Sequence, residues 1–167
     1  MEECALTADN RLIDVTIDEI GQRAVSPEIQ QERRVAVFDL LENNSFTLVD
    51  RKDAAAPSGP YRLCIAYREE RVVFDVADES GARIVEFRLL TNPFRQVMKD
   101  YLEICSSYFD AVKTAPVSRI ETIDMARRAI HNEGAKVLSE RLSGKVDVDE
   151  ETARRLFTLI CALRPGR

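Results

Sequence analysis

The chain contains one histidine, His131, and its spacing to three charged residues is the clearest chemical signal in the sequence. Segment 118–142 has helical periodicity, and one apolar stripe on it contains Ile120, Ile123, Ile130, Val137 and Leu138. Arg127 and His131 project into that stripe, and Asp124 lies on its edge. Because residues three and four apart meet on a helix surface, we expect Asp124, Arg127, Arg128 and His131 to lie together.

This group of side chains has two interpretations. A carboxylate, two guanidiniums and an imidazole could hold a small anion, or could tune the pKa of the imidazole toward neutrality. The same side chains could instead form a polar network that joins the helix to its neighbours, because buried Arg and His need partners. The network alone would explain the pattern, so the group is a candidate ligand site or a structural one.

Gly134 lies on the same stripe, in the middle of the predicted helix. Glycine in a helix interior costs about 0.8–1.0 kcal/mol relative to alanine. The sequence therefore predicts a close neighbour at Gly134. The simplest neighbour is another backbone, and a ligand is the alternative.

Motifs for common catalytic chemistry are absent from the sequence. There is no glycine-rich dinucleotide or phosphate loop and no Gly-x-Ser-x-Gly elbow. A single histidine argues against a histidine-rich metal site. The cysteines (Cys4, Cys64, Cys105 and Cys161) are far apart, which is typical of reduced core thiols. We therefore predict no catalytic residue, no metal and no cofactor.

The distribution of charge and of apolar residues narrows the class of partner. The net charge is −5, with −7 in residues 1–117 and +2 in residues 118–167. An acidic protein repels the phosphate backbone, so nucleic acid is an unlikely partner. No run of about 18 apolar residues occurs, so no membrane span is predicted. The acidic start, Met1-Glu2-Glu3-Cys4, is unlike a secretory signal, and we expect a cytoplasmic protein.

The order of the predicted elements indicates an α+β fold. Strands are predicted at 11–17, 46–49, 61–67, 71–77 and 84–90, and helices at 26–42, 92–114, 118–142 and from 147 or 149 to about 164. We expect an antiparallel sheet of about four to five strands. A helix near the N-terminus and three C-terminal helices should pack on it. Residues 10–167 would form a single domain after a loose tail at 1–9.

Two local features of the helices lead to further expectations. Ser118-Arg119-Ile120-Glu121 reads as a capping box at the start of the third helix. The first helix has one apolar face with Ile29, Ala36, Val37, Leu40 and Leu41, and a second apolar side with Val35 and Phe38. That second side is either covered by the fold or partly open to a partner, and we expect it to be covered.

Five segments carry a resemblance to a known family: 32–46 (ERRVAVFDLLENNSF), 59–63 (GPYRL), 93–108 (PFRQVMKDYLEICSSY), 123–134 (IDMARRAIHNEG) and 138–163 (LSERLSGKVDVDEETARRLFTLICAL). Together they are similar to uncharacterised protein family 0262, a group of small bacterial proteins found mainly in alphaproteobacteria. The resemblance covers Asn10 to Leu163. It implies a bacterial cytoplasmic setting, but it assigns no activity and no site residue.

These observations lead to two functional hypotheses. The first is a non-enzymatic interaction or regulatory protein, which binds a partner protein or a second copy of itself through a helical face. The alternative is a small enzyme or an anion-binding or phosphate-binding protein, with a pocket at Asp124, Arg127 and His131. Nucleic-acid binding ranks last.

Overall fold

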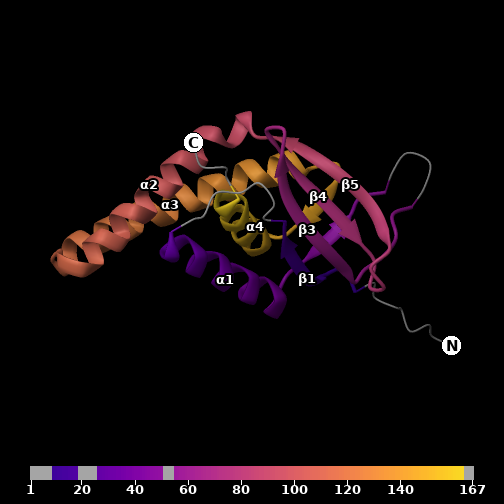
Figure 1. Ribbon diagram of the computed structural model, residues 1–167, viewed down its shortest axis with the longest axis horizontal. Coiled ribbons are helices and arrows are strands. Elements are labelled where there is room, and N and C mark those ends of the chain that lie inside the picture. Colours follow the sequence, from indigo (N-terminus) through magenta and orange to yellow (C-terminus); the bar gives the residue numbers. More distant parts are fainter. Residues whose placement is uncertain (1–8, 19–25, 51–54, 164–167) are drawn as a thin grey trace.

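The computed structural model describes residues 9–18, 26–50 and 55–163 (Figure 1). In chain order the elements are β1 (Leu12–Ile17), α1 (Pro27–Glu42), β2 (Phe46–Leu48), β3 (Tyr61–Arg68), β4 (Arg71–Ala77), β5 (Arg83–Leu90), a 3-10 turn η1 (Asn92–Phe94), α2 (Arg95–Thr114), α3 (Val117–Leu142), β6 (Val146–Val148) and α4 (Glu150–Ala162). The predicted α+β class is confirmed. Apart from Asp9, the predicted tail at 1–9 lies outside the described residues.

A four-stranded sheet has the order β1-β3-β4-β5. Its three consecutive strands, β3, β4 and β5, are antiparallel as predicted, and a two-residue turn joins β3 to β4. Glu69 and Glu70 both have positive φ in that turn, which suits the twist of a tight hairpin. However, β1 pairs with β3 in parallel. A parallel pair needs a long connection between its strands, and α1 and β2 lie in that connection.

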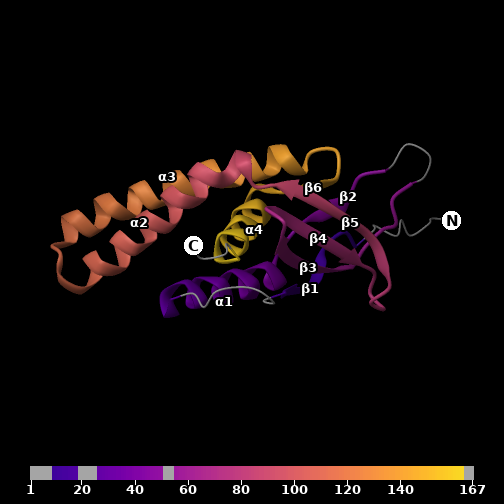
Figure 2. The ribbon, with the colours of Figure 1, turned by 45° about the horizontal axis from the view of Figure 1, so that its top comes forward.

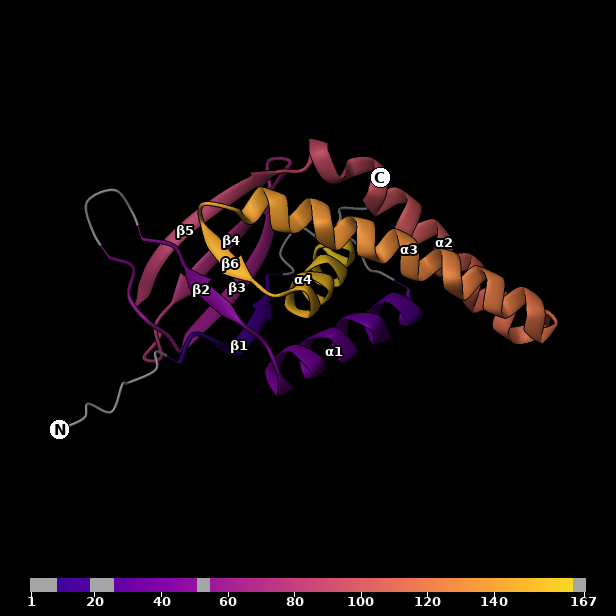
Figure 3. The same cartoon turned by 180° about the vertical axis from the view of Figure 1, so that it is seen from behind.

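A second, two-stranded sheet forms where β2 pairs antiparallel with β6. The sequence predicted the first strand of this ribbon but placed it with the main sheet, and it did not predict β6. Each strand has only three residues, which is too short for an alternating pattern. Figure 3 shows the ribbon on the side of the main sheet that also carries the helices.

Helix α4 is the centre of the molecule, between the main sheet, α1 and α3 (Figures 1 and 3). Its apolar residues Leu156, Phe157 and Ile160 are fully buried, and Thr158 on another side is also buried. The opposite face of the sheet carries ion pairs, including Arg62 with Asp14 and Arg83 with Asp75. The sheet therefore has one helix-covered face and one wetter face, as its alternating pattern predicted.

Helices α2 and α3 form an antiparallel hairpin that extends beyond the sheet (Figure 2). The buried residues of α3 are Gly134, Ala135, Leu138 and Leu142, all in its second half. The first half of α3 contacts α2 but leaves the body of the molecule. Most of the predicted apolar stripe on α3 is consequently half-buried rather than fully enclosed.

The predicted capping box at the start of α3 is wrong. The N-cap is Pro116, without a side-chain cap, and the helix begins at Val117. The Pro116 carbonyl accepts the first hydrogen bonds, from the backbone N–H groups of Arg119 and Ile120. Ser118 is therefore already inside the helix, where its carbonyl accepts a hydrogen bond from the Thr122 hydroxyl.

Candidate functional site

Asp124 is the centre of the first group of charged side chains on α3. Its Oδ1 lies 2.8 Å from Arg127 Nη2, and its Oδ2 lies 2.9 Å from Arg128 Nη2. The hydrogen bond from Arg127, together with the charges of both arginines, holds the pKa of the Asp124 carboxyl below its ordinary value. The guanidinium carbon of Arg127 also lies 4.4 Å from the centre of the Tyr108 ring on α2. Helical spacing thus correctly predicted that Asp124, Arg127 and Arg128 lie together.

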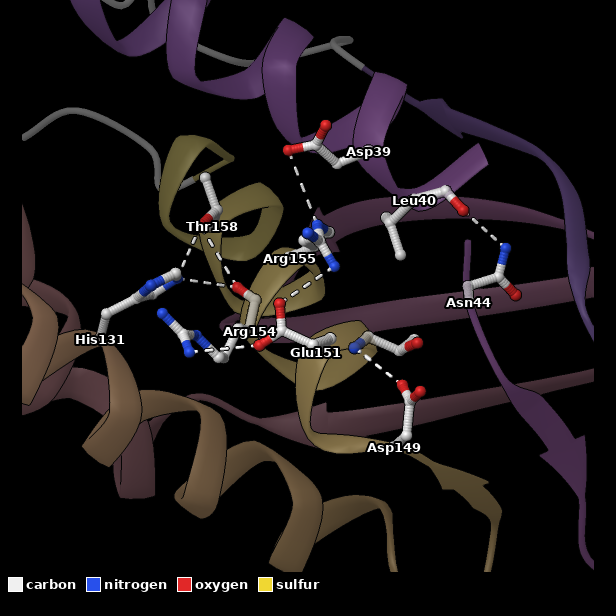
Figure 4. Close-up of polar contacts among 10 residues, drawn as sticks. Asp39, Leu40, Asn44, His131, Asp149, Glu151, Arg154, Arg155 and Thr158 are labelled. Carbon is white, nitrogen blue, oxygen red and sulfur yellow. Dashed lines mark hydrogen bonds and ion pairs between the residues drawn. The ribbon is translucent and has the colours of Figure 1, made fainter. Parts of the chain in front are cut away.

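His131 has its polar contacts elsewhere, on α4. Its Nε2 lies 2.9 Å from the Arg154 carbonyl oxygen and 2.9 Å from Thr158 Oγ1 (Figure 4). Because a carbonyl oxygen only accepts, we assign the tautomer in which Nε2–H donates. The imidazole also stacks on Tyr101 of α2, with ring centres 5.0 Å apart. His131 therefore joins α3 to both α2 and α4.

Burial decides the protonation state of His131. It lowers the pKa of the imidazole to about 4, so the ring is neutral near pH 7. The hydrogen bond to the Arg154 carbonyl opposes this shift and is the smaller effect. A neutral imidazole held by a backbone carbonyl and a hydroxyl fits the structural-network interpretation of the group.

Gly134 faces the aromatic ring of Phe157 on α4. A Cβ atom at Gly134 would lie 2.3 Å from Phe157 Cζ, far inside van der Waals contact. The predicted close neighbour therefore exists. It is a side chain, however, and the expectation of another backbone is wrong.

His131 also borders a hollow of about 160 Å³ between α1, α3 and α4. Its other lining residues are Glu32, Val35, Ala36 and Asp39 from α1, and Glu151, Arg154, Arg155 and Thr158 from α4. Asp124 and Arg127 do not line it. The structure thus separates the predicted site residues into two places on α3.

The arginines of this hollow are engaged with carboxylates (Figure 4). Arg154 and Arg155 lie 3.2 and 3.4 Å from the two oxygens of Glu151, and Arg155 lies 3.7 Å from Asp39. With Glu32 also present, the carboxylates outnumber the guanidiniums, so the hollow does not favour an anion. Sequence reasoning missed this cluster, although the three- and four-residue spacing of Glu151 to Arg154 and Arg155 signals it.

Helix α1 exposes its second apolar side. Ala36 and Leu40 are buried on the inner side, whereas Val35, Phe38 and Leu41 have exposed fractions of 45%, 65% and 40%. We call these three side chains the outer stripe. The prediction that Leu41 lies on the first apolar face is wrong, because Leu41 is exposed beside Phe38. The expectation that the fold covers the second apolar side is wrong, because these three side chains stay exposed although α1 packs against α4 and β1. The outer stripe adjoins the hollow, since Val35 belongs to both.

Several site types find no match in the described part of the chain. No cluster of three or more His, Cys, Asp or Glu side chains there could hold a metal ion. No described helix is long and apolar enough to cross a membrane. Cys105 and Cys161 are buried and Cys64 is half-buried. Burial raises the pKa of the Cys105 thiol, which therefore stays protonated. Cys4 lies outside the described residues.

The comparisons with known proteins agree with the predicted resemblance. Residues 9–165 match the model of an uncharacterised protein family, UPF0262. A UPF0262 protein of Paracoccus denitrificans is 62% identical over 157 residues, which is 94% of this chain and 97% of that protein. A UPF0262 protein of Dinoroseobacter shibae is 59% identical over 94% of this chain and 99% of its own length. No solved structure is significantly similar to the chain.

Proposed function

We propose that this chain, which belongs to the bacterial, uncharacterised protein family UPF0262, is a non-enzymatic cytoplasmic protein that binds a partner protein along α1. The observation that carries the proposal is the outer stripe of Val35, Phe38 and Leu41. Single exposed apolar residues are common on protein surfaces and need no explanation. These three are spaced three residues apart, so they share one face of a helix that is already packed on its other face.

The partner that suits this surface is an amphipathic helix of another protein. Such a helix packs its apolar face along a groove, and the side chains that make the contact have helical spacing. Val35 and Phe38 supply apolar contacts, while Asp39 and Arg155 supply the polar rim that interfaces usually have. A stable dimer buries about 800 Å² on each partner, and three side chains are a small part of that. A short segment of a different protein therefore fits better than a second copy of this chain.

The alternative proposal, anion binding at Asp124, Arg127 and His131, has weaker support. Both arginines of that group contact Asp124, and His131 contacts α4 instead. Asp124 thus offsets positive charge that an anion would need, and the Arg127 side chain is only 23% exposed. This alternative predicts that inorganic phosphate raises the melting temperature and that Arg127→Gln removes the rise. Our proposal predicts no phosphate effect.

Binding measurements with purified protein test the proposal. Partners recovered from a lysate are identified, and their affinities for wild type and for Val35→Ser/Phe38→Ser are compared. Loss of two apolar contacts predicts binding weaker by about tenfold or more. Leu90→Ser is the matched control, because Leu90 is 54% exposed at the end of β5 and should leave binding unchanged. Equal weakening by both variants, or self-association as the only binding found, would contradict the proposal.

A further inference from the structure

A second hollow lies away from α1, where the edge strand β5 meets the β2–β6 ribbon. Its volume is about 540 Å³, within the range of about 300–1,000 Å³ that is usual for small-molecule sites. Leu48 and Val49 form one wall, Ile84, Val85 and Phe87 of β5 form another, and Ala56 and Pro57 border it. Figure 3 shows the ribbon in front of the sheet whose edge strand is β5.

The walls of this hollow are apolar and well supported. Phe87 stacks on the fully buried Phe74 of β4, with ring centres 5.1 Å apart and planes 10° apart. Leu48 is buried, whereas Val49, Val85 and Phe87 are only half-buried. Water therefore contacts apolar side chains that the sheet holds in place. An apolar molecule that displaced this water would gain hydrophobic free energy without rearranging the strands.

Among the lining residues that the structure describes, Lys145 is the one with a charged side chain. Its backbone is fixed, because its N–H donates to the Leu142 carbonyl and its carbonyl accepts from Val49 N–H. The preceding residue, Gly144, has a φ of 86°, a conformation that glycine adopts easily at the end of a helix. The side chain of Lys145 is exposed and makes no ion pair with any described residue. Lys145 thus adds a positively charged residue to the described lining of an apolar hollow.

We propose that this hollow binds a small aliphatic carboxylate, with its hydrocarbon chain between β5 and the ribbon and its carboxylate against Lys145. The apolar walls select the chain and the ammonium selects the charge of the head group. A neutral alcohol of equal length would lose the charge-assisted contact, and a cationic amphiphile would be repelled. The site is independent of the proposed partner surface on α1.

Titration calorimetry of the full chain with dodecanoate, below its micelle concentration, tests this inference. We expect saturable binding by wild type, weaker binding of dodecanol, and none of dodecyltrimethylammonium. Lys145→Met should weaken dodecanoate binding by about tenfold and leave dodecanol binding unchanged. Lys113→Met removes an exposed lysine at the far end of α2 and serves as the matched control.

A variant that fills the hollow tests the position of the chain. Val85→Phe should abolish binding of both dodecanoate and dodecanol, provided that its circular dichroism spectrum matches that of wild type. Val49→Phe fills the same space from the opposite wall and replaces it if the first variant does not fold. The inference is overturned if folded wild type does not bind dodecanoate, if Lys145→Met binds it as wild type does, or if neither filling variant changes binding.

Discussion

At the scale of single residues, His131 makes folding stability depend on pH. Its pKa is about 4 in the folded protein, against 6.5 for an ordinary histidine. Between these values the unfolded chain binds a proton that the folded chain does not. The contribution of neutral His131 to the free energy of unfolding is therefore complete above pH 6.5. It is lost as the pH falls toward 4.

We therefore expect the free energy of unfolding to fall by about 2 kcal/mol between about pH 7 and about pH 5. Urea denaturation at a series of pH values measures this change. His131→Gln keeps a donor for the Arg154 carbonyl but does not titrate, so it should lack most of this dependence. If both proteins lost stability equally over this range, His131 would not be the group responsible.

A second prediction concerns Gly134→Ala. Alanine favours the helix by about 0.8–1.0 kcal/mol, but its Cβ would clash with Phe157, and overpacking a core costs about 1–3 kcal/mol. We expect a net loss of about 1–2 kcal/mol in urea denaturation. In a Phe157→Leu background the same change should be neutral or stabilising. A stabilising effect of Gly134→Ala in wild type would show that Phe157 is not the obstacle.

The sequence predicted residue contacts within a helix better than contacts between helices. The spacing of Asp124, Arg127 and Arg128 was enough to place their side chains together. The partners of His131 lie 23 and 27 residues further along the chain, on α4. No periodicity within α3 contains that information, because it depends on how the two helices pack.

At the scale of elements, Asn44 fixes the end of α1 to β1. Its Oδ1 accepts from Leu12 N–H at 2.7 Å, and its Nδ2 donates to the carbonyls of Leu12 and Leu40 at 3.0 and 2.6 Å. The sequence indicated Asn43-Asn44 only as a helix stop. Together with the packing of α1 on α4, these three bonds fix the orientation of α1 and the direction of the outer stripe.

Asn44→Asp should therefore lower the free energy of unfolding by about 2 kcal/mol, because a carboxylate would face two carbonyl oxygens. Asn43→Asp is the matched control. Asn43 is the exposed neighbour, and the hydrogen bond from its backbone N–H to the Asp39 carbonyl would be kept. We expect the control to change stability by no more than about 0.5 kcal/mol. Equal effects of the two substitutions would mean that charge, and not the bonds of Asn44, determines the loss.

The boundaries of long elements followed from the sequence, and those of short ones did not. The alternation of Val72, Phe74 and Val76 predicted β4 as the structure has it, Arg71–Ala77. The residues of β6 pair with residues of β2 that lie 98 to 102 positions earlier in the chain. A strand of three residues is stabilised by that distant pairing rather than by a local pattern.

At the scale of the whole molecule, α4 explains why α1 has a free side. The apolar side chains of α4 are buried almost all round, so one central helix supplies the inner contacts of both α1 and α3. The sequence predicted the α+β class from the order of elements. It did not predict the parallel pairing of β1, the projection of the α2–α3 hairpin or the open side of α1. These depend on where the body of the fold ends, which an apolar stripe on a single helix does not specify.

Photo-cross-linking in living cells determines whether the outer stripe of α1 contacts a partner protein. A photoreactive amino acid is placed at Phe38 or, as the control, at Leu90, two exposed apolar positions on different elements. We predict a defined cross-linked partner at Phe38 that is absent at Leu90. The same products at both positions, or none at Phe38, would contradict the claim.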